Sequence, residues 1–281
     1  MKSNSFWICL LTLMLFSCKN ENKPTRYMYG SESDSAVFYF HKAWEHILDY
    51  GQWTESEAAF RKAVEFDSSF LVGKSLLGKN TTNLEERIKL LDEVNSKKHL
   101  ASEDELLIID MTLLTLQLFN DRDQGKTISP EFIQHFYNVG ERDLRKFSSK
   151  YPSESYIKAE YIEFLHAQHG AQLALDSIGI LASNKQKKLP FFISYSAILH
   201  AELGDYDIAL EKASQLEKQT NDSSIPEPHA LFAKIYFMMD SIELADNYIS
   251  KAIELDSNHI IAKRLKRQID EKMKEVNDPI D

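Results

Sequence analysis

The stretch "GDYDIALEKASQL", residues 204–216, decides the fold together with "DSIELADNYISKAIELDS" (240–257) and "GQWTESEAAFRKAVEFDS" (51–68). Each stretch begins with a turn residue, and an aromatic residue or isoleucine follows two places later. Small and large apolar residues then recur at spacings of three and four, which places them on one face of a helix. Self-similarity of this kind predicts a chain built from repeated helical units.

The composition agrees with a helical protein. Of 281 residues, 43% are apolar, which is ample for a packed core, whereas only 9 are glycine and 7 are proline. The 43 acidic residues outnumber the 33 basic ones and give a formal net charge of −10, which disfavours binding to nucleic acid or to an anionic membrane surface. We therefore expect an all-α protein that binds no nucleic acid.

The three quoted stretches resemble the second helix of the tetratricopeptide repeat (TPR), a helix–turn–helix unit of 34 residues. Units begin near Val37, Ser155, Pro190 and Pro226, with less regular helix pairs between them. Small residues at a helix crossing let the two axes approach, so each unit is buried only by its neighbours. The resemblance implies a right-handed α-solenoid of about six helix pairs over residues 36–277.

Two helices are predicted in the less regular middle of the chain. Ser102 and Glu105 form a capping box, and residues 106–119 are apolar on nearly all sides. This pattern favours a buried central helix over a stripe that binds a partner. Ser129 and Pro130 are typical of the start of a further helix.

Residues 259–276 are expected to form a terminal capping helix, which a solenoid needs to cover its last repeat. One face carries mixed charge and is expected to face solvent. The apolar face consists of Ile260, Ile261, Leu265, Ile269 and Met273.

The N-terminus is typical of a secreted protein. Lys2 precedes an eleven-residue apolar stretch, residues 6–16, which is shorter than the roughly 20 residues that a membrane-spanning helix needs. Residues 15–18, Leu-Phe-Ser-Cys, resemble the lipobox of bacterial lipoproteins, which implies cleavage after residue 17 and lipidation of Cys18. Plain secretion, or a cytosolic chain with an apolar start, are the alternatives.

Three segments follow from this interpretation: a signal peptide over residues 1–17, a lipidated N-terminus with a flexible tether over 18–35, and the repeat domain over 36–277. The tether is expected because residues 19–35 are polar and show no apolar period. Lys19 resembles the residue after the cysteine in lipoproteins sent to the outer membrane. The expected location is therefore the bacterial cell envelope, lipid-anchored at the outer membrane, on either the periplasmic or the surface face.

No motif for catalysis or for a cofactor is convincing. Residues 125–127, Gly-Lys-Thr, lack the first glycine and the preceding strand of a phosphate-binding loop. Glu163, His166 and His169 share a helix face, but no second cluster of metal ligands accompanies them. We therefore predict a non-catalytic protein with no cofactor and no metal.

In TPR proteins the first helix of each unit lines a concave groove through its second, fifth, ninth and twelfth positions. The resemblance therefore implies a partner-binding groove, which in this chain consists of Phe38, His41, Glu45, Leu48, Tyr156, Glu163, His166, Phe191, Ser194, Ile198, Glu227, Lys234 and Phe237. This mixture of apolar and acidic residues predicts that the groove binds an extended or helical protein segment with apolar anchors and a basic residue.

The predicted function is a membrane-anchored scaffold or adaptor lipoprotein that mediates protein–protein interaction. Two alternatives remain open. The Tyr-Pro-x-x-x-Tyr step at residues 151–156 resembles a repeat junction of an accessory lipoprotein of outer-membrane barrel assembly. A glycan- or nutrient-binding lipoprotein is the other, although only Trp44 and Trp53 would remain to contact a sugar after signal cleavage.

Overall fold

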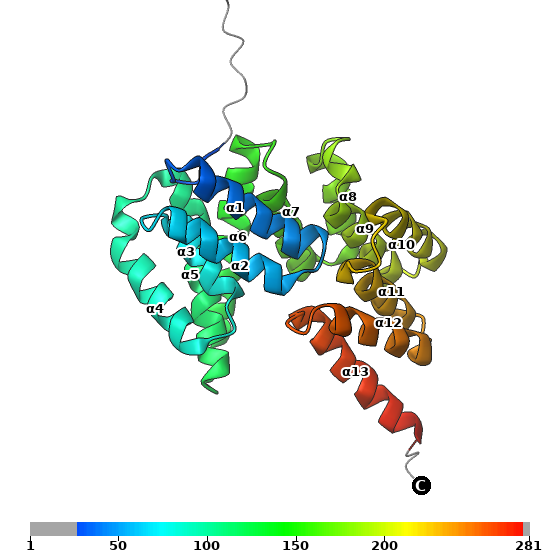
Figure 1. Cartoon of the computed structure of the whole chain (residues 1–281). Helices are drawn as coiled ribbons and strands as arrows, with labels where there is room; N and C mark the ends of the chain where they lie inside the picture. Colours follow the sequence, from blue (N-terminus) through cyan, green and yellow to red (C-terminus); the bar gives the residue numbers. More distant parts are fainter. Residues whose placement is uncertain (1–26, 278–281) are drawn as a thin grey trace, which may run out of the picture.

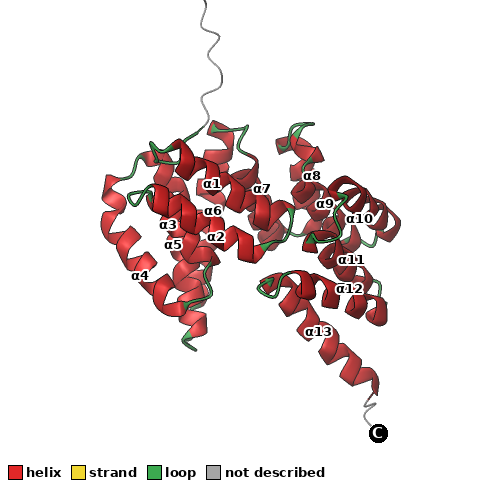
Figure 2. Ribbon diagram, in the orientation of Figure 1, coloured by secondary structure: helices red, strands yellow, loops and turns green. Residues whose placement is uncertain are grey.

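The computed structural model describes residues 27–277, and this part of the chain consists of helices joined by loops, with no strand (Figure 2). Ser102 and Ser129 cap two of the helices as predicted, because each side chain accepts a hydrogen bond from a backbone N–H of the first helical turn. The thirteen α-helices are α1 (Asp34–Trp44), α2 (Trp53–Phe66), α3 (Leu71–Asn80), α4 (Leu84–Lys97), α5 (Glu103–Asp123), α6 (Pro130–Lys150), α7 (Ser155–His169), α8 (Ala171–Leu181), α9 (Pro190–Glu202), α10 (Tyr206–Thr220), α11 (Pro226–Met238), α12 (Ile242–Leu255) and α13 (Ile260–Asn277).

Consecutive helices pack against each other along the whole described chain, and helices two apart, such as α9 and α11, also contact each other (Figure 1). Helix pairs therefore stack on helix pairs, and the expectation of a TPR-like solenoid with six pairs and a final helix is confirmed. Ser155, Pro190 and Pro226 begin α7, α9 and α11 as predicted, whereas the first unit begins at Asp34, slightly before Val37.

Small residues mark the helix crossings, as the repeat pattern predicted. Ala209 and Ala213 of α10, and Ala245 and Ala252 of α12, are fully buried. Leucine and isoleucine side chains fill the remaining space, with Leu216 as one example. Close approach of the axes at alanine is the reason that two helices of modest apolar content bury each other well.

The core is divided into overlapping clusters. The largest joins α1 to α7 through aromatic residues such as Phe40, Phe60 and Phe147, and it includes the apolar length of α5, which is central as predicted. Smaller clusters join α7 to α9, α9 to α11 and α11 to α13. Because each cluster shares a helix with the next, burial is continuous along the repeats.

The flexible tether predicted over residues 18–35 is wrong for residues 27–35. Tyr29 is buried, with its ring 4.5 Å from that of Phe40, and Ser31 Oγ donates a hydrogen bond to Asp67 at 2.6 Å. Ser33 then caps α1 by accepting the N–H of Ala36. Single tyrosines fix this segment by packing against the repeat domain, and single residues give no periodic pattern in the sequence. The predicted signal peptide and Cys18 lie outside the described residues.

The final helix α13 covers α12 with Leu265 and Ile269, so the predicted capping position is confirmed. Ile261 was expected on the buried face, but it is 51% exposed, because that side of α13 borders a cavity rather than α12. Within residues 27–277 no helix combines the length and the apolar content that crossing a membrane requires.

Candidate binding site

The turn between α1 and α2 brings the first helix pair against the last repeats. After α1 the chain continues as a π-helical turn, Glu45–Asp49, before α2 begins at Trp53. Residues 49–54, here called the docking turn, form hydrogen bonds with residues that lie between 107 and 204 positions further along the chain. A π-helical turn reorients the side chains that follow it, and such turns are frequent at functional sites.

Three helix N-termini are capped across this contact. Asp49 Oδ1 accepts the N–H of Phe191 in the first turn of α9 at 3.0 Å, and the Tyr50 carbonyl accepts the N–H of Glu227 in α11 at 3.1 Å. In the reverse direction, Asp256 accepts the N–H of Thr54 in α2 at 3.0 Å. The residue before each of these helices provides no side-chain cap. The docking turn therefore satisfies backbone groups that would otherwise lack partners.

Gly51 allows the close approach. Its φ is +66°, and a Cβ atom there would lie 2.9 Å from His259 Nε2 and 3.3 Å from the backbone nitrogen of Glu227. Any other residue would face both an unfavourable backbone conformation and a steric overlap.

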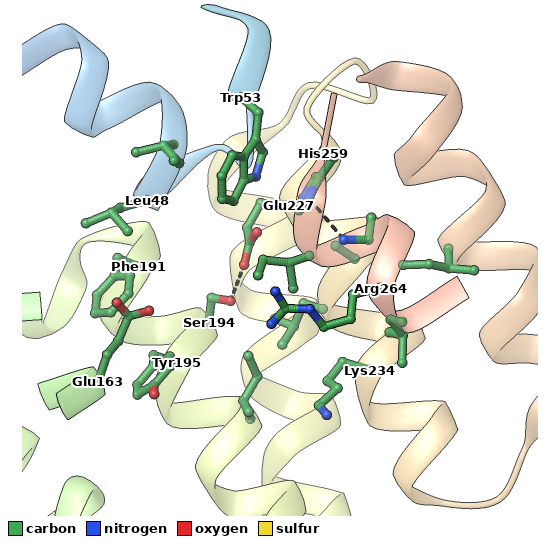
Figure 3. A pocket seen from close by; sticks show the side chains of 18 of the residues that line it. Leu48, Trp53, Glu163, Phe191, Ser194, Tyr195, Glu227, Lys234, His259 and Arg264 are labelled. Carbon is green, nitrogen blue, oxygen red and sulfur yellow. Dashed lines mark hydrogen bonds between the residues drawn. The ribbon is translucent and has the colours of Figure 1, made fainter. Parts of the chain in front are cut away.

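A cavity of about 480 Å³ lies on the inner side of the repeats, next to the docking turn (Figure 3). Its walls come from α1 and the turn after it, from α2, α3, α7, α9, α11 and α13, and from α12 through Ile249. Trp44, Trp53, Phe191 and Tyr195 provide aromatic surface. The volume is in the range typical of ligand pockets.

Seven of the thirteen predicted groove residues meet at this cavity: Leu48, Glu163, Phe191, Ser194, Ile198, Glu227 and Lys234. They come from three first helices, α7, α9 and α11, and from the turn that follows α1. The groove positions that the TPR resemblance implies therefore lie at the cavity in three units and at the end of the first helix.

The other six predicted residues do not line the cavity and contact neighbouring side chains instead. Phe38 is 50% exposed and packs on Tyr39, and the ring of His41 lies 5.5 Å from that of Tyr29. The remaining four have polar or cation–π partners, which are Lys42 and Tyr50 for Glu45, Asp49 for Tyr156, Tyr195 and Glu202 for His166, and Lys272 for Phe237.

The sequence reasoning missed more than half of the cavity wall. Trp44, Trp53, Lys79, Glu160, Tyr195, His259 and Arg264 are among these residues. Trp53 carried a signal, since it occupies the aromatic position of a quoted repeat. Arg264 was assigned to a solvated face of the capping helix, and nothing local in the sequence shows that this face borders the cavity.

Two carboxylates in the wall are held at raised pKa. Burial raises the pKa of Glu227 to about 7, although Ser194 donates a hydrogen bond to its Oε1 and partly opposes the effect. Burial and the charge of Glu160 raise the pKa of Glu163, and Lys79 only partly offsets them. Lys79 itself is bound to Glu160 at 2.5 Å. The charged forms of Glu163 and Glu227 are thus incompletely compensated by the protein.

His259 is neutral in this wall. Burial lowers its pKa to about 4, and its Nδ1 accepts the N–H of Ala262 at 3.2 Å, which assigns the remaining proton to Nε2. Nε2 has no hydrogen-bond partner among the described residues. The cations Lys234 and Arg264 also line the cavity, and within residues 27–277 neither forms an ion pair.

The three polar residues that share a face of α7 in the sequence are not brought together in the structure. Among residues 27–277 no three histidine, cysteine, aspartate or glutamate side chains are grouped as metal ligands. His169 contacts Glu141 and His166 contacts Glu202, whereas Glu163 lines the cavity, so the three residues that share a face of α7 diverge.

Comparison with known proteins assigns this chain to no family. No family model matches the sequence, and no curated protein matches it. Among solved structures, a similar chain occurs in the crystal structure of the APC/C hetero-tetramer Cut9–Hcn1, with 15% sequence identity and a TM-score of 0.43. The match covers 84% of this chain and 42% of that chain, so this chain spans less than half of its length.

Proposed function

We propose that this protein is a non-catalytic adaptor that holds a segment of a partner protein in the cavity inside its repeats. The observation that carries the proposal is the meeting of seven predicted groove residues at one cavity with aromatic walls. Aromatic anchors in a concave, partly enclosed surface are typical of the residues that dominate binding energy in protein interfaces.

The proposal includes an anchor in the bacterial cell envelope, at the outer membrane, through a lipid on Cys18. It is supported by the sequence alone, in which an apolar stretch ends at a cysteine and a polar segment follows. An acidic body on such an anchor would be held near the membrane by its lipid rather than by its surface charge.

A matched pair of glutamines tests the adaptor function. Gln268 lines the cavity and is exposed, whereas Gln215 is an exposed residue of α10 outside the cavity wall. A photoreactive amino acid at each position, activated in intact cells, should give a discrete protein adduct from position 268 and none from 215. Identical adducts from both positions, or none from either, would contradict the proposal.

One observation favours a second candidate, a lipoprotein that binds a glycan or another small polar nutrient. Trp44 and Trp53 line the same cavity, together with the amide side chains of Asn80 and Gln268. Aromatic faces with planar polar groups suit a sugar ring. Calorimetric titration of the purified chain with saccharides would discriminate, because a saccharide that binds and blocks the adduct at position 268 would replace the adaptor proposal.

The barrel-assembly alternative has no comparable support. Tyr151 packs against Tyr27 and Phe147, and Tyr156 stacks on Trp44, so the junction that suggested it serves internal packing.

A further inference from the structure

The acidic wall of the cavity has no sufficient counter-charge in the protein. Glu163 forms no hydrogen bond or ion pair within residues 27–277, and Glu227 accepts only the hydroxyl of Ser194 among side-chain donors. Removing a carboxylate from water is costly unless a cation or several hydrogen bonds replace the solvent. A ligand with a positive group would provide that replacement.

The cations of the protein do not provide it. Lys79 is already bound to Glu160, and buried His259 is held neutral. Arg264 is exposed, and Lys234 forms no ion pair in the described chain, so both are free for groups outside the acidic wall. Figure 3 shows Glu163 and Glu227 on separate helices, and in this view the Arg264 guanidinium and Lys234 lie beyond Glu227, on the side away from Glu163.

The chain itself shows how this wall binds an ammonium group. Lys79 Nζ lies 5.7 Å from the centre of the Trp44 ring and 2.5 Å from Glu160 Oε2. A carboxylate and a tryptophan face thus hold a primary ammonium inside the cavity, through an ion pair and a cation–π contact. Glu163 lies one helical turn after Glu160 on α7, and no lysine of the described chain occupies the corresponding place beside it.

We propose that the cavity receives a lysine or arginine side chain of the partner, whose cationic head lies between Glu163 and Glu227 and whose alkyl stem packs on the tryptophans. The inference rests on the proposed adaptor function, since it takes the cation to belong to a protein segment. Lys234 and Arg264 would then contact acidic residues that flank the inserted side chain. The partner segment is therefore apolar, with one basic residue and acidic neighbours.

Short blocked peptides test this directly by calorimetric titration of the full-length chain. The probes are N-acetylated, C-amidated pentapeptides of leucine and aspartate with a central lysine, arginine, acetyl-lysine or norleucine. The lysine and arginine peptides should bind at least tenfold more tightly than the acetyl-lysine and norleucine peptides, because charge-assisted hydrogen bonds to a carboxylate are the strong ones. Equal affinity of the acetyl-lysine peptide would overturn the proposal.

Variants of the two cavity carboxylates provide a second test of the proposal. Glu163→Gln and Glu227→Gln should each weaken the lysine peptide by roughly tenfold to a hundredfold, whereas Glu211→Gln on the outer surface of α10 should leave its affinity unchanged. Glutamine keeps the shape and removes a partly buried charge, so these variants are expected to fold, which circular dichroism would verify. Unchanged binding by both cavity variants would sink the idea.

Cadaverine, a free diamine, distinguishes a protein side chain from a small amine. It should bind far more weakly than the lysine peptide, because it lacks the apolar and acidic flanks. Equal affinity of cadaverine and the lysine peptide would show that the site binds a free amine and not a side chain of a partner. If no peptide binds while position 268 still gives its adduct in cells, the cationic occupant is wrong and the adaptor function stands, which separates the two failures.

Discussion

Glu227→Gln is expected to stabilise the protein, and the gain should grow with pH. The pKa of Glu227 rises from 4.5 to about 7 in the fold, so between these values the folded chain keeps a proton that the unfolded chain releases. The free energy of unfolding of the natural protein therefore falls as the pH rises through this range. Glutamine does not titrate, so the free energy of unfolding of the variant does not fall in this way as the pH rises.

The magnitude follows from the same values. Each tenfold change in proton affinity corresponds to about 1.4 kcal/mol, so the charged form of Glu227 costs the fold at most about 3 kcal/mol. The advantage of the variant should grow from about 1 kcal/mol at pH 5 to about 3 kcal/mol at pH 8. The groups that face Glu227 are Asp49, Glu163, Ser194 and His259, and they are present in both proteins.

Thermal unfolding at pH 5 and pH 8 measures the effect. For a chain of this size, about 3 kcal/mol corresponds to a rise of roughly 6–12 °C in the midpoint. Glu211→Gln provides the control, because an exposed carboxylate on α10 should change the midpoint little at either pH. A difference that does not grow with pH, or a natural protein that is the more stable at pH 8, would refute the reasoning.

Two further predictions concern the docking turn and the anchor. Gly51→Ala should lower the thermal midpoint of unfolding more than Gly125→Ala. The backbone φ is positive at both positions (+66° and +69°), but only a Cβ at position 51 would overlap His259. A similar loss in both variants would show that the turn is not tightly docked. Cys18→Ser should abolish incorporation of a clickable fatty acid and release the chain from the membrane fraction. The control variant Cys9→Ser should change neither result. Fatty-acid label retained by Cys18→Ser would contradict the anchor.

The repeat fold was predictable because its packing is encoded locally. Alanines at spacings of four and seven in residues 204–257 share a helix face with apolar residues one or two turns away, so the buried face is visible in the sequence. Capping serines and Pro190 or Pro226 mark the helix starts just as locally. The segment at residues 27–33 escaped prediction because Tyr29 is held by residues of α1 and by Glu154, which are distant from one another in the sequence.

The docking turn was not predictable for a related reason. Two quoted repeats end in Asp-Ser, at Asp67 and Asp256, a pattern that indicates a turn, and both aspartates do accept a hydrogen bond from the backbone N–H two residues later. The second oxygen makes a contact that is distant in the sequence: that of Asp67 accepts a hydrogen bond from Ser31, and that of Asp256 accepts one from Thr54, 202 residues away. One motif thus has a local role that the sequence reveals and a distant role that it does not.

The same contact limits what the predicted groove can hold. An open solenoid would let a helix lie along the first helices, as the family positions imply, and would use Phe38 and Phe237 at either end. In this chain Trp53 of the docking turn lines the inner space, and the cavity there has a volume of about 480 Å³, which suits a few side chains. We therefore expect an extended segment that inserts a side chain past Lys234 and Arg264. The partly buried carboxylates of Glu163 and Glu227 lower the stability of the empty protein, and a cationic occupant would recover that energy as affinity.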